Sequence, residues 1–167
     1  IYMISLKRID VKDFMAKLLI QNTFDNFLLS ELDIVTYNHF HITGALNEEF
    51  YTSEELELLE GRKYATWSET KAFAFSFIKG NKLPLSIKIV FHLSQVNLEN
   101  VLEKSGTPLK ASDVNGLFVN VRFEKGNATI ITGSSIKIFT MDKSLERIWD
   151  SNVKSFLKHS EIAVEEE

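Results

Sequence analysis

Two stretches of this chain repeat each other, and the repeat limits the possible folds more than any other feature. Residues 28–44 read LLSELDIVTYNHFHITG, and residues 117–133 read LFVNVRFEKGNATIITG. They align without a gap, with Asn38 matching Asn127 and with Ile-Thr-Gly ending both stretches. Apolar residues alternate in each, which is typical of strands with one buried face. We therefore expect each stretch to form an antiparallel hairpin.

The same two elements precede each hairpin, which favours internal duplication over a chance similarity of two amphipathic hairpins. A strand and a helix are expected at residues 4–9 and 11–20 before the first hairpin. A second strand and helix are expected at residues 85–93 and 95–104 before the second hairpin. A repeat of this length constrains the fold of the whole chain more than a short motif does.

A third strand is expected after each hairpin. Phe73, Phe75 and Phe77 alternate with small residues, a period of two that indicates a half-buried strand. Residues 135–140 are also expected to form a strand. The sequence thus predicts an α+β fold of internally duplicated strand–helix–three-strand units with mainly antiparallel sheets, plus a C-terminal amphipathic helix.

We interpret residues 1–167 as a single domain, because the length suits one core and only 7 Gly and 2 Pro leave little room for linkers. The first repeat covers about residues 4–79 with an inserted helix near 53–60, the second about 85–140, and the C-terminal helix about 143–159. Thr52 and Glu55 have the spacing of a capping box for the inserted helix. Residues 79–82 predict a turn. The acidic tail, residues 165–167, is expected to fray.

The second half resembles the domain of DNA sliding clamps. The resemblance rests on Val90-Phe91-His92-Leu93-Ser94, a helix ending Leu102-Glu103-Lys104, the stretch from Val114 to Val121 that begins Val-Asn-Gly, and the stretch from Gly126 to Gly133. Bacterial clamps are similar there, with Asn-Gly before an aliphatic strand and a second strand that ends in Thr. The resemblance covers about half of the chain. It implies a clamp-like fold, and fold alone is a weak guide to function.

The whole chain also resembles an uncharacterised bacterial family of unknown function from the Firmicutes. The matching stretches are Asp10-Val11-Lys12-Asp13-Phe14-Met15, Ser144-Leu145-Glu146 and Trp149-Asp150. This resemblance implies no activity.

The composition and the missing motifs exclude several classes of function. The chain has no Cys, so disulfides, thiolate metal sites and a thiol nucleophile are excluded. No apolar run reaches the length of a membrane span, and no signal peptide is apparent, so we expect a cytoplasmic protein without membrane contact. Phosphate-binding glycine loops and a nucleophile elbow are missing, so no cofactor and no catalytic residue are assigned. The net charge of −4 argues against a general nucleic-acid coat.

A basic stripe on the C-terminal helix is the main candidate site. Lys143, Arg147, Lys154 and Lys158 fall within an arc of roughly 60° at 100° per residue, opposite the apolar side chains. Such a stripe is compatible with a solvated helix face, and cations late in a helix also complement its dipole. The functional alternative is contact with nucleic acid or with an acidic protein surface.

Histidines supply the weaker candidates. His39 and His41 leave one face of a strand, and His92 could join them in a metal site, although strand-end histidines commonly have no such role. A rival hypothesis is an enzyme whose dispersed site contains these histidines and Glu54. We favour a non-catalytic binding or scaffold module. Because open sheet edges invite pairing, we also expect a homodimer or a protein partner at those edges.

Overall fold

The computed structural model describes residues 4–78 and 82–167. Its elements are β1 (Ser5–Lys7), α1 (Val11–Leu19), β2 (Leu28–Val35), β3 (His39–Thr43), α2 (Ser53–Leu58), α3 (Trp67–Phe77), β4 (Ser86–His92), α4 (Gln95–Ser105), β5 (Val114–Glu124), β6 (Asn127–Ile136), α5 (Ser144–His159) and β7 (Glu165–Glu166), with short 3-10 helices at Glu48–Phe50 and Ala111–Asp113. The predicted α+β class is confirmed, as are the inserted helix, now α2, and the C-terminal helix, now α5.

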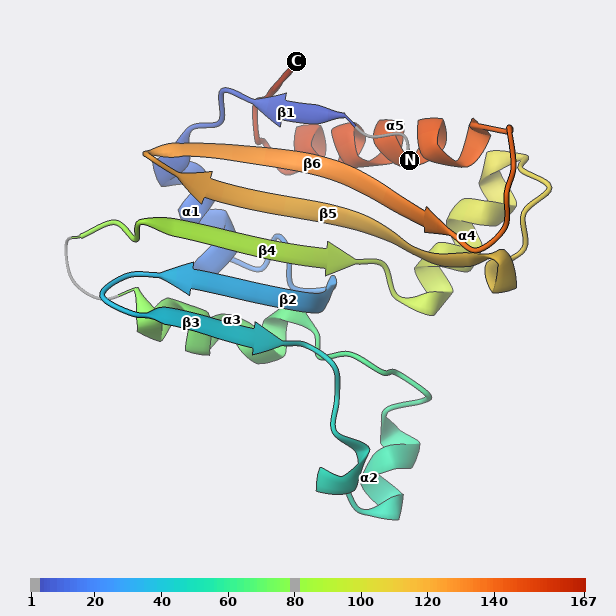
Figure 1. The fold of residues 1–167 in the computed structure, drawn as a ribbon, viewed down its shortest axis with the longest axis horizontal. Coiled ribbons are helices and arrows are strands. Elements are labelled where there is room, and N and C mark those ends of the chain that lie inside the picture. Colours follow the sequence, from blue (N-terminus) through green and yellow to red (C-terminus); the bar gives the residue numbers. More distant parts are fainter. Residues whose placement is uncertain (1–3, 79–81) are drawn as a thin grey trace.

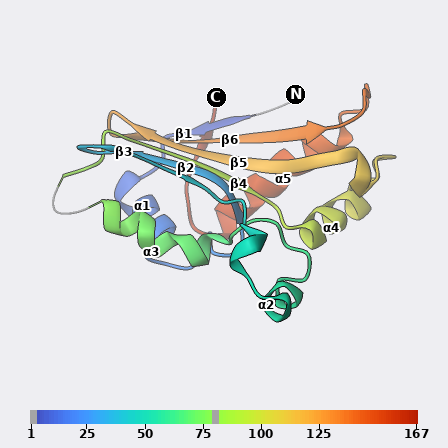
Figure 2. The ribbon, with the colours of Figure 1, turned by 60° about the horizontal axis from the view of Figure 1, so that its bottom comes forward.

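The described strands form one sheet with the order β3-β2-β4-β5-β6-β1-β7, and every pairing in it is antiparallel (Figure 1). Figure 2 shows α1, α3, α4 and α5 on the same side of this sheet. The fold therefore has two layers, with one sheet face covered by helices and the other open. The edges are β3 on one side and the two-residue β7 on the other. Helix α2 projects away from the sheet (Figure 1).

Aromatic rings fill the space between the central strands and the helices. Phe24 stacks on Phe91 of β4 with ring centroids 5.6 Å apart, and Phe14 of α1 meets Phe24 edge-on at 5.8 Å. Trp67 at the start of α3 is fully buried, and its indole Nε1 donates a hydrogen bond to the carbonyl oxygen of Leu18 at 2.7 Å. Each such buried side chain contributes about 2 kcal/mol through the removal of apolar surface from water. The rings thus hold α1 and α3 against the centre of the sheet.

The strand predicted around Phe73 and Phe75 is wrong, because these residues lie in α3. Thr66 and Glu69 form a capping box, in which each side chain bonds the other residue's backbone amide, and this sets the start of a helix. Phe73 and Phe75 are 63% and 48% exposed, whereas Ala74 between them is fully buried. The alternation of Phe with small residues therefore did not reflect burial on a strand face.

The separate third strand predicted at residues 135–140 is also wrong. Strand β6 continues through Gly133 to Ile136, and residues 137–143 form the connection to α5. Each half therefore has a strand, a helix and two strands, not three. The predicted turn at residues 79–82 falls largely outside the described residues.

The two hairpins differ in register by one residue. The turn between β2 and β3 has three residues, and the turn between β5 and β6 has two. Beyond the turns, residues that align in the sequence therefore face opposite sides of the sheet. Thr43 is exposed while its aligned counterpart Thr132 is fully buried, and Ile42 packs against the core while Ile131 lies on the open face. Internal duplication remains a prediction of the sequence.

The first testable consequence concerns Gly44 and its aligned counterpart Gly133. A Cβ on Gly44 would stand 1.7 Å from the backbone carbonyl oxygen of Leu29, whereas the nearest atom to a Cβ on Gly133 is Asn120 Nδ2 at 3.5 Å. We expect Gly44→Ala to lower the free energy of unfolding by about 3 kcal/mol, the upper range for overpacking, since backbone must move. Gly133→Ala should change it by less than about 1 kcal/mol. Urea unfolding measures both, and equal midpoints for the two variants would contradict this packing.

Candidate binding surface on helix α5

Helix α5 docks on the sheet through a regular apolar stripe. Leu145, Trp149, Val153 and Leu157 recur at every fourth residue, and each is at most 4% exposed. The Trp149 indole Nε1 donates a hydrogen bond to the backbone oxygen of Phe118 on β5 at 3.0 Å. These contacts fix the rotation of the helix about its own axis, and so decide which side chains face the solvent.

Asp142 precedes Lys143, the N-cap residue of α5, and bonds the first residue of the helix. Its Oδ1 accepts hydrogen bonds from the amide and the hydroxyl of Ser144, at 2.7 and 2.6 Å. These bonds lower the pKa of Asp142, with a smaller contribution from the positive charge of Arg147. The carboxylate thus stays ionised at the positive end of the helix dipole.

The four predicted site residues of α5 all reach the solvent. Lys143 stands at the N-cap, and Arg147, Lys154 and Lys158 follow along the outward side. At 1.5 Å per residue the stripe is about 22 Å long. Ser151 and Ser155, which are also exposed, lie among the cations. The helix therefore offers a row of positive charges and hydroxyl groups.

The acidic residues of α5 point the other way. Glu146 and Asp150, one helical turn apart, are only 4% and 5% exposed. Thr132 on β6 donates its hydroxyl to Asp150 Oδ1 at 2.5 Å. Burial raises the pKa of Asp150, although the bond from Thr132 opposes this shift. The charged side chains that α5 exposes are consequently all basic.

Sequence reasoning missed these two inward acids as candidates for a function. Glu146 and Asp150 share an arc with the apolar residues Leu145 and Trp149, and a helical projection could have identified them.

The acidic tail does not fray, contrary to expectation. Strand β7 pairs with β1, and Lys7 Nζ lies 2.6 Å from Glu167 Oε2. Glu166 forms an ion pair with Lys154. Pairing with β1 and ion pairs with three cations, Lys7, Arg8 and Lys154, thus order a segment that its composition predicted to be frayed. Among the described residues, Lys143, Arg147 and Lys158 form no ion pair, so the tail neutralises one part of the basic stripe.

His39 and His41 lie on the exposed face of β3 and share one carboxylate. His39 Nε2 and His41 Nδ1 lie 2.7 and 2.8 Å from Asp33 Oδ1. Burial alone would raise the pKa of Asp33, but the hydrogen bonds from His41 and His39 outweigh it and lower the pKa. Within residues 4–78 and 82–167, no three His, Cys, Asp or Glu side chains have a geometry that could hold a metal ion.

His92 lies elsewhere, at the far end of β4. It is 8% exposed, its Nδ1 lies 2.6 Å from Ser30 Oγ, and the Tyr64 ring meets it edge-on at 4.5 Å. It lines a cavity of about 500 Å³ together with Arg62 and Ser94. Burial lowers the pKa of His92 to about 4, so the ring is neutral at physiological pH.

The residues of the rival enzyme hypothesis are not brought together. His92 pairs with Leu28 at one end of β2, while His39 pairs with Val35 at the other end, roughly 23 Å away at 3.3 Å per residue. Glu54 is exposed on the projecting α2 and does not line the His92 cavity. The four residues therefore occupy three separate places.

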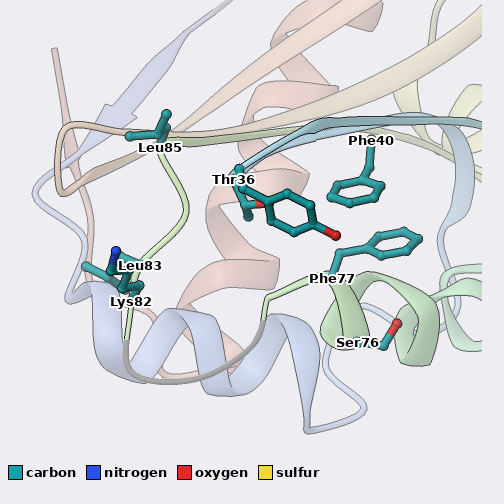
Figure 3. A pocket seen from close by; sticks show the side chains of 8 residues that line it. Thr36, Phe40, Ser76, Phe77, Lys82, Leu83 and Leu85 are labelled. Atoms are coloured by element: carbon teal, nitrogen blue, oxygen red, sulfur yellow. The ribbon is translucent and has the colours of Figure 1, made fainter.

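An apolar cavity of about 590 Å³ opens between α3 and the β2–β3 turn (Figure 3). The rings of Phe40 and Phe77 stack nearly parallel at its wall, with centroids 4.4 Å apart, and Leu83 and Leu85 line the opposite side. Among the described residues that line it, the polar ones are Thr36, Tyr37, Ser76 and Lys82, and none is an acid or a histidine.

His92 should make folding stability depend on pH. Its pKa falls from about 6.5 in the unfolded chain to about 4 in the fold, so the unfolded chain binds more protons between these values. The contribution is fully present above pH 6.5 and decreases by about 3 kcal/mol as the pH falls toward 4. We expect His92→Gln to flatten this part of the urea-unfolding profile between pH 7 and 4.5. Identical profiles for the two proteins would show that His92 is not buried as described.

Comparison with known proteins places the chain in a family but gives it no solved relative. No curated protein and no solved structure matches the chain. The resemblance to sliding clamps therefore has no matching clamp fold to support it. Among residues 4–78 and 82–167, no helix is long and apolar enough to cross a bilayer. A family model described as a family of unknown function, DUF5721, matches residues 17–165, so the chain belongs to the DUF5721 family.

Proposed function

We propose that this protein is a non-catalytic binding module that holds nucleic acid through the outward face of α5. One observation carries the proposal: every charged side chain that α5 exposes is basic, because both of its acidic residues are turned inward. Double-stranded DNA carries one negative charge per 1.7 Å of its axis, so a basic row about 22 Å long meets several phosphates.

The side chains between the cations favour phosphate contacts over base contacts. Exposed Ser151, Asn152 and Ser155 are donors of the kind that commonly bind phosphate oxygens. The outward face has no aromatic residue on which an unpaired base could stack. We therefore propose binding to the backbone of a duplex, without sequence preference.

The clamp resemblance supports a role on DNA, but through a different helix. In the clamp-like segment, α4 exposes Glu99 and Glu103, which repel phosphate. Helix α5 has the opposite character. The proposed module is thus a clamp-like, internally duplicated domain whose contact surface is the C-terminal helix.

The main test is fluorescence anisotropy of a labelled duplex at several salt concentrations. With three or four phosphates contacted, the slope of log K against log salt should be about −3. The variant Arg147→Glu with Lys158→Glu should weaken binding at least tenfold and flatten this slope. The matched control, Lys12→Glu with Lys104→Glu, makes the same change in net charge on α1 and α4 and should bind within about threefold of the unaltered protein.

Two outcomes would contradict the proposal. Equal losses in both double variants would mean that net charge matters and the α5 face does not. No binding at low salt would exclude nucleic acid, and an acidic protein surface would then become the better partner for the stripe.

We also infer self-association through the β3 edge. Among the described strands, β3 pairs on one side only, and it is longer than the acidic edge strand β7. A two-fold pairing of β3 with its copy would extend the sheet across a dimer. Light scattering should give twice the mass of the chain at micromolar concentration, and a strictly monomeric mass would rule this dimer out.

A further inference from the structure

Glu146 is a buried carboxylate without a partner. It is 4% exposed, and no hydrogen bond or ion pair joins it to any residue that the structure describes. Its Oε2 is completely enclosed. Burying a charged group without compensation is costly, and such groups are rare in folded proteins unless something binds them.

A cavity of about 240 Å³ adjoins Glu146. It lies between the end of β6, the connection to α5 and the first turn of α5, and is lined by Ser134, Ile136, Ile138, Phe139, Thr140, Lys143 and Glu146. The walls therefore combine three apolar side chains with two hydroxyl groups, one ammonium group and one carboxylate. A pocket of this kind suits a ligand with an aliphatic stem and a polar end.

A second acid increases the negative charge behind this cavity. Asp150 lies one turn further along α5, and its Oδ2 is also enclosed and unpaired. Burial is the main cause of the raised pKa of Asp150, and the charges of Glu166 and Glu146 raise it further by smaller amounts. Lys143 is among the residues that line the cavity, so one cationic side chain is already present there. A cationic group entering the cavity would meet Glu146, since Asp150 is not among the residues that line it.

The connection between β6 and α5, part of which lines this cavity, exposes apolar side chains. Ile138 is 49% exposed, Phe139 91% and Met141 83%, all within the connection between β6 and α5. Clustered exposed apolar residues commonly mark a surface that contacts another protein.

We propose that this cavity receives the cationic end of a lysine or arginine side chain from a partner polypeptide, with Glu146 as its counter-ion. The aliphatic stem would pack on Ile136 and Ile138, and flanking residues of the partner would cover Phe139 and Met141. A bound metal ion fits less well, because in the described part of the chain no third His, Cys, Asp or Glu joins these two acids. The cavity shares Lys143 with the basic stripe, while Arg147, Lys154 and Lys158 do not line it.

The first test uses n-butylammonium chloride, which reproduces the end of a lysine side chain, with 1-pentanol as a neutral control of similar shape. We expect saturable changes in the amide NMR signals of residues 134–146, with a Kd on the order of millimolar. A concentration ten times the Kd should raise the Tm by about 3 °C. Glu146→Gln should lose both effects and should itself unfold at the same or a higher temperature. Lys143→Ala should bind several-fold more tightly, because it removes a competing cation.

A second variant provides a control in case the Glu146→Gln protein does not fold. Ile136→Trp fills the cavity from its wall and should also abolish binding while Glu146 stays in place. Binding of 1-pentanol equal to that of n-butylammonium, or unchanged binding in Glu146→Gln, would overturn the site.

A second experiment tests whether the ligand is a polypeptide or a free amine. The peptide acetyl-Gly-Leu-Lys-Leu-Gly-amide should bind at least tenfold more tightly than n-butylammonium, and Phe139→Ser should remove that gain without affecting the small probe. A peptide that binds no more tightly than the free amine would overturn the polypeptide assignment and leave a small-amine site.

Discussion

The packing of α5 on the sheet is the interaction on which the rest of the account depends. Leu145, Trp149 and Val153 fix the helix in one rotation, and the indole bond to β5 prevents a slip along it. That rotation turns Glu146 and Asp150 inward and leaves the basic residues outside. A helix of mixed charge is thereby divided into two chemically different faces. Both proposals follow from this division, one for each face.

Much of the fold can be read from the sequence, because capping residues and strand periodicity are local. Helix α2 begins at its capping box, and the main strands fall within a few residues of their expected positions. The failures occur where burial comes from distant residues. Phe73 and Phe75 alternate like a strand, yet the alternation arises from exposure on α3. The turns of the two aligned hairpins differ in length by one residue. Side chains at aligned positions of β3 and β6 therefore point to opposite faces of the sheet.

Part of the candidate site could also be predicted, because it depends on local sequence patterns. The basic stripe depends only on helical spacing and an exposed face, and the four residues do reach the solvent. The ordering of the tail by β1 and the lack of a partner for Glu146 depend on residues far apart in the chain, so no local pattern contains them. The histidines show the reverse case, since His92 lies at the opposite end of β2 from His39 and His41.

The central claim is that the outward face of α5 is the surface of this protein that binds nucleic acid. Titrating an isotopically labelled sample with a short DNA duplex, and following each backbone amide by NMR, tests it most directly. The account predicts shifts concentrated at Lys143, Arg147, Ser151 and Lys158, which weaken as salt rises. Shifts centred on the open sheet face or on α4, or none at low salt, would contradict it.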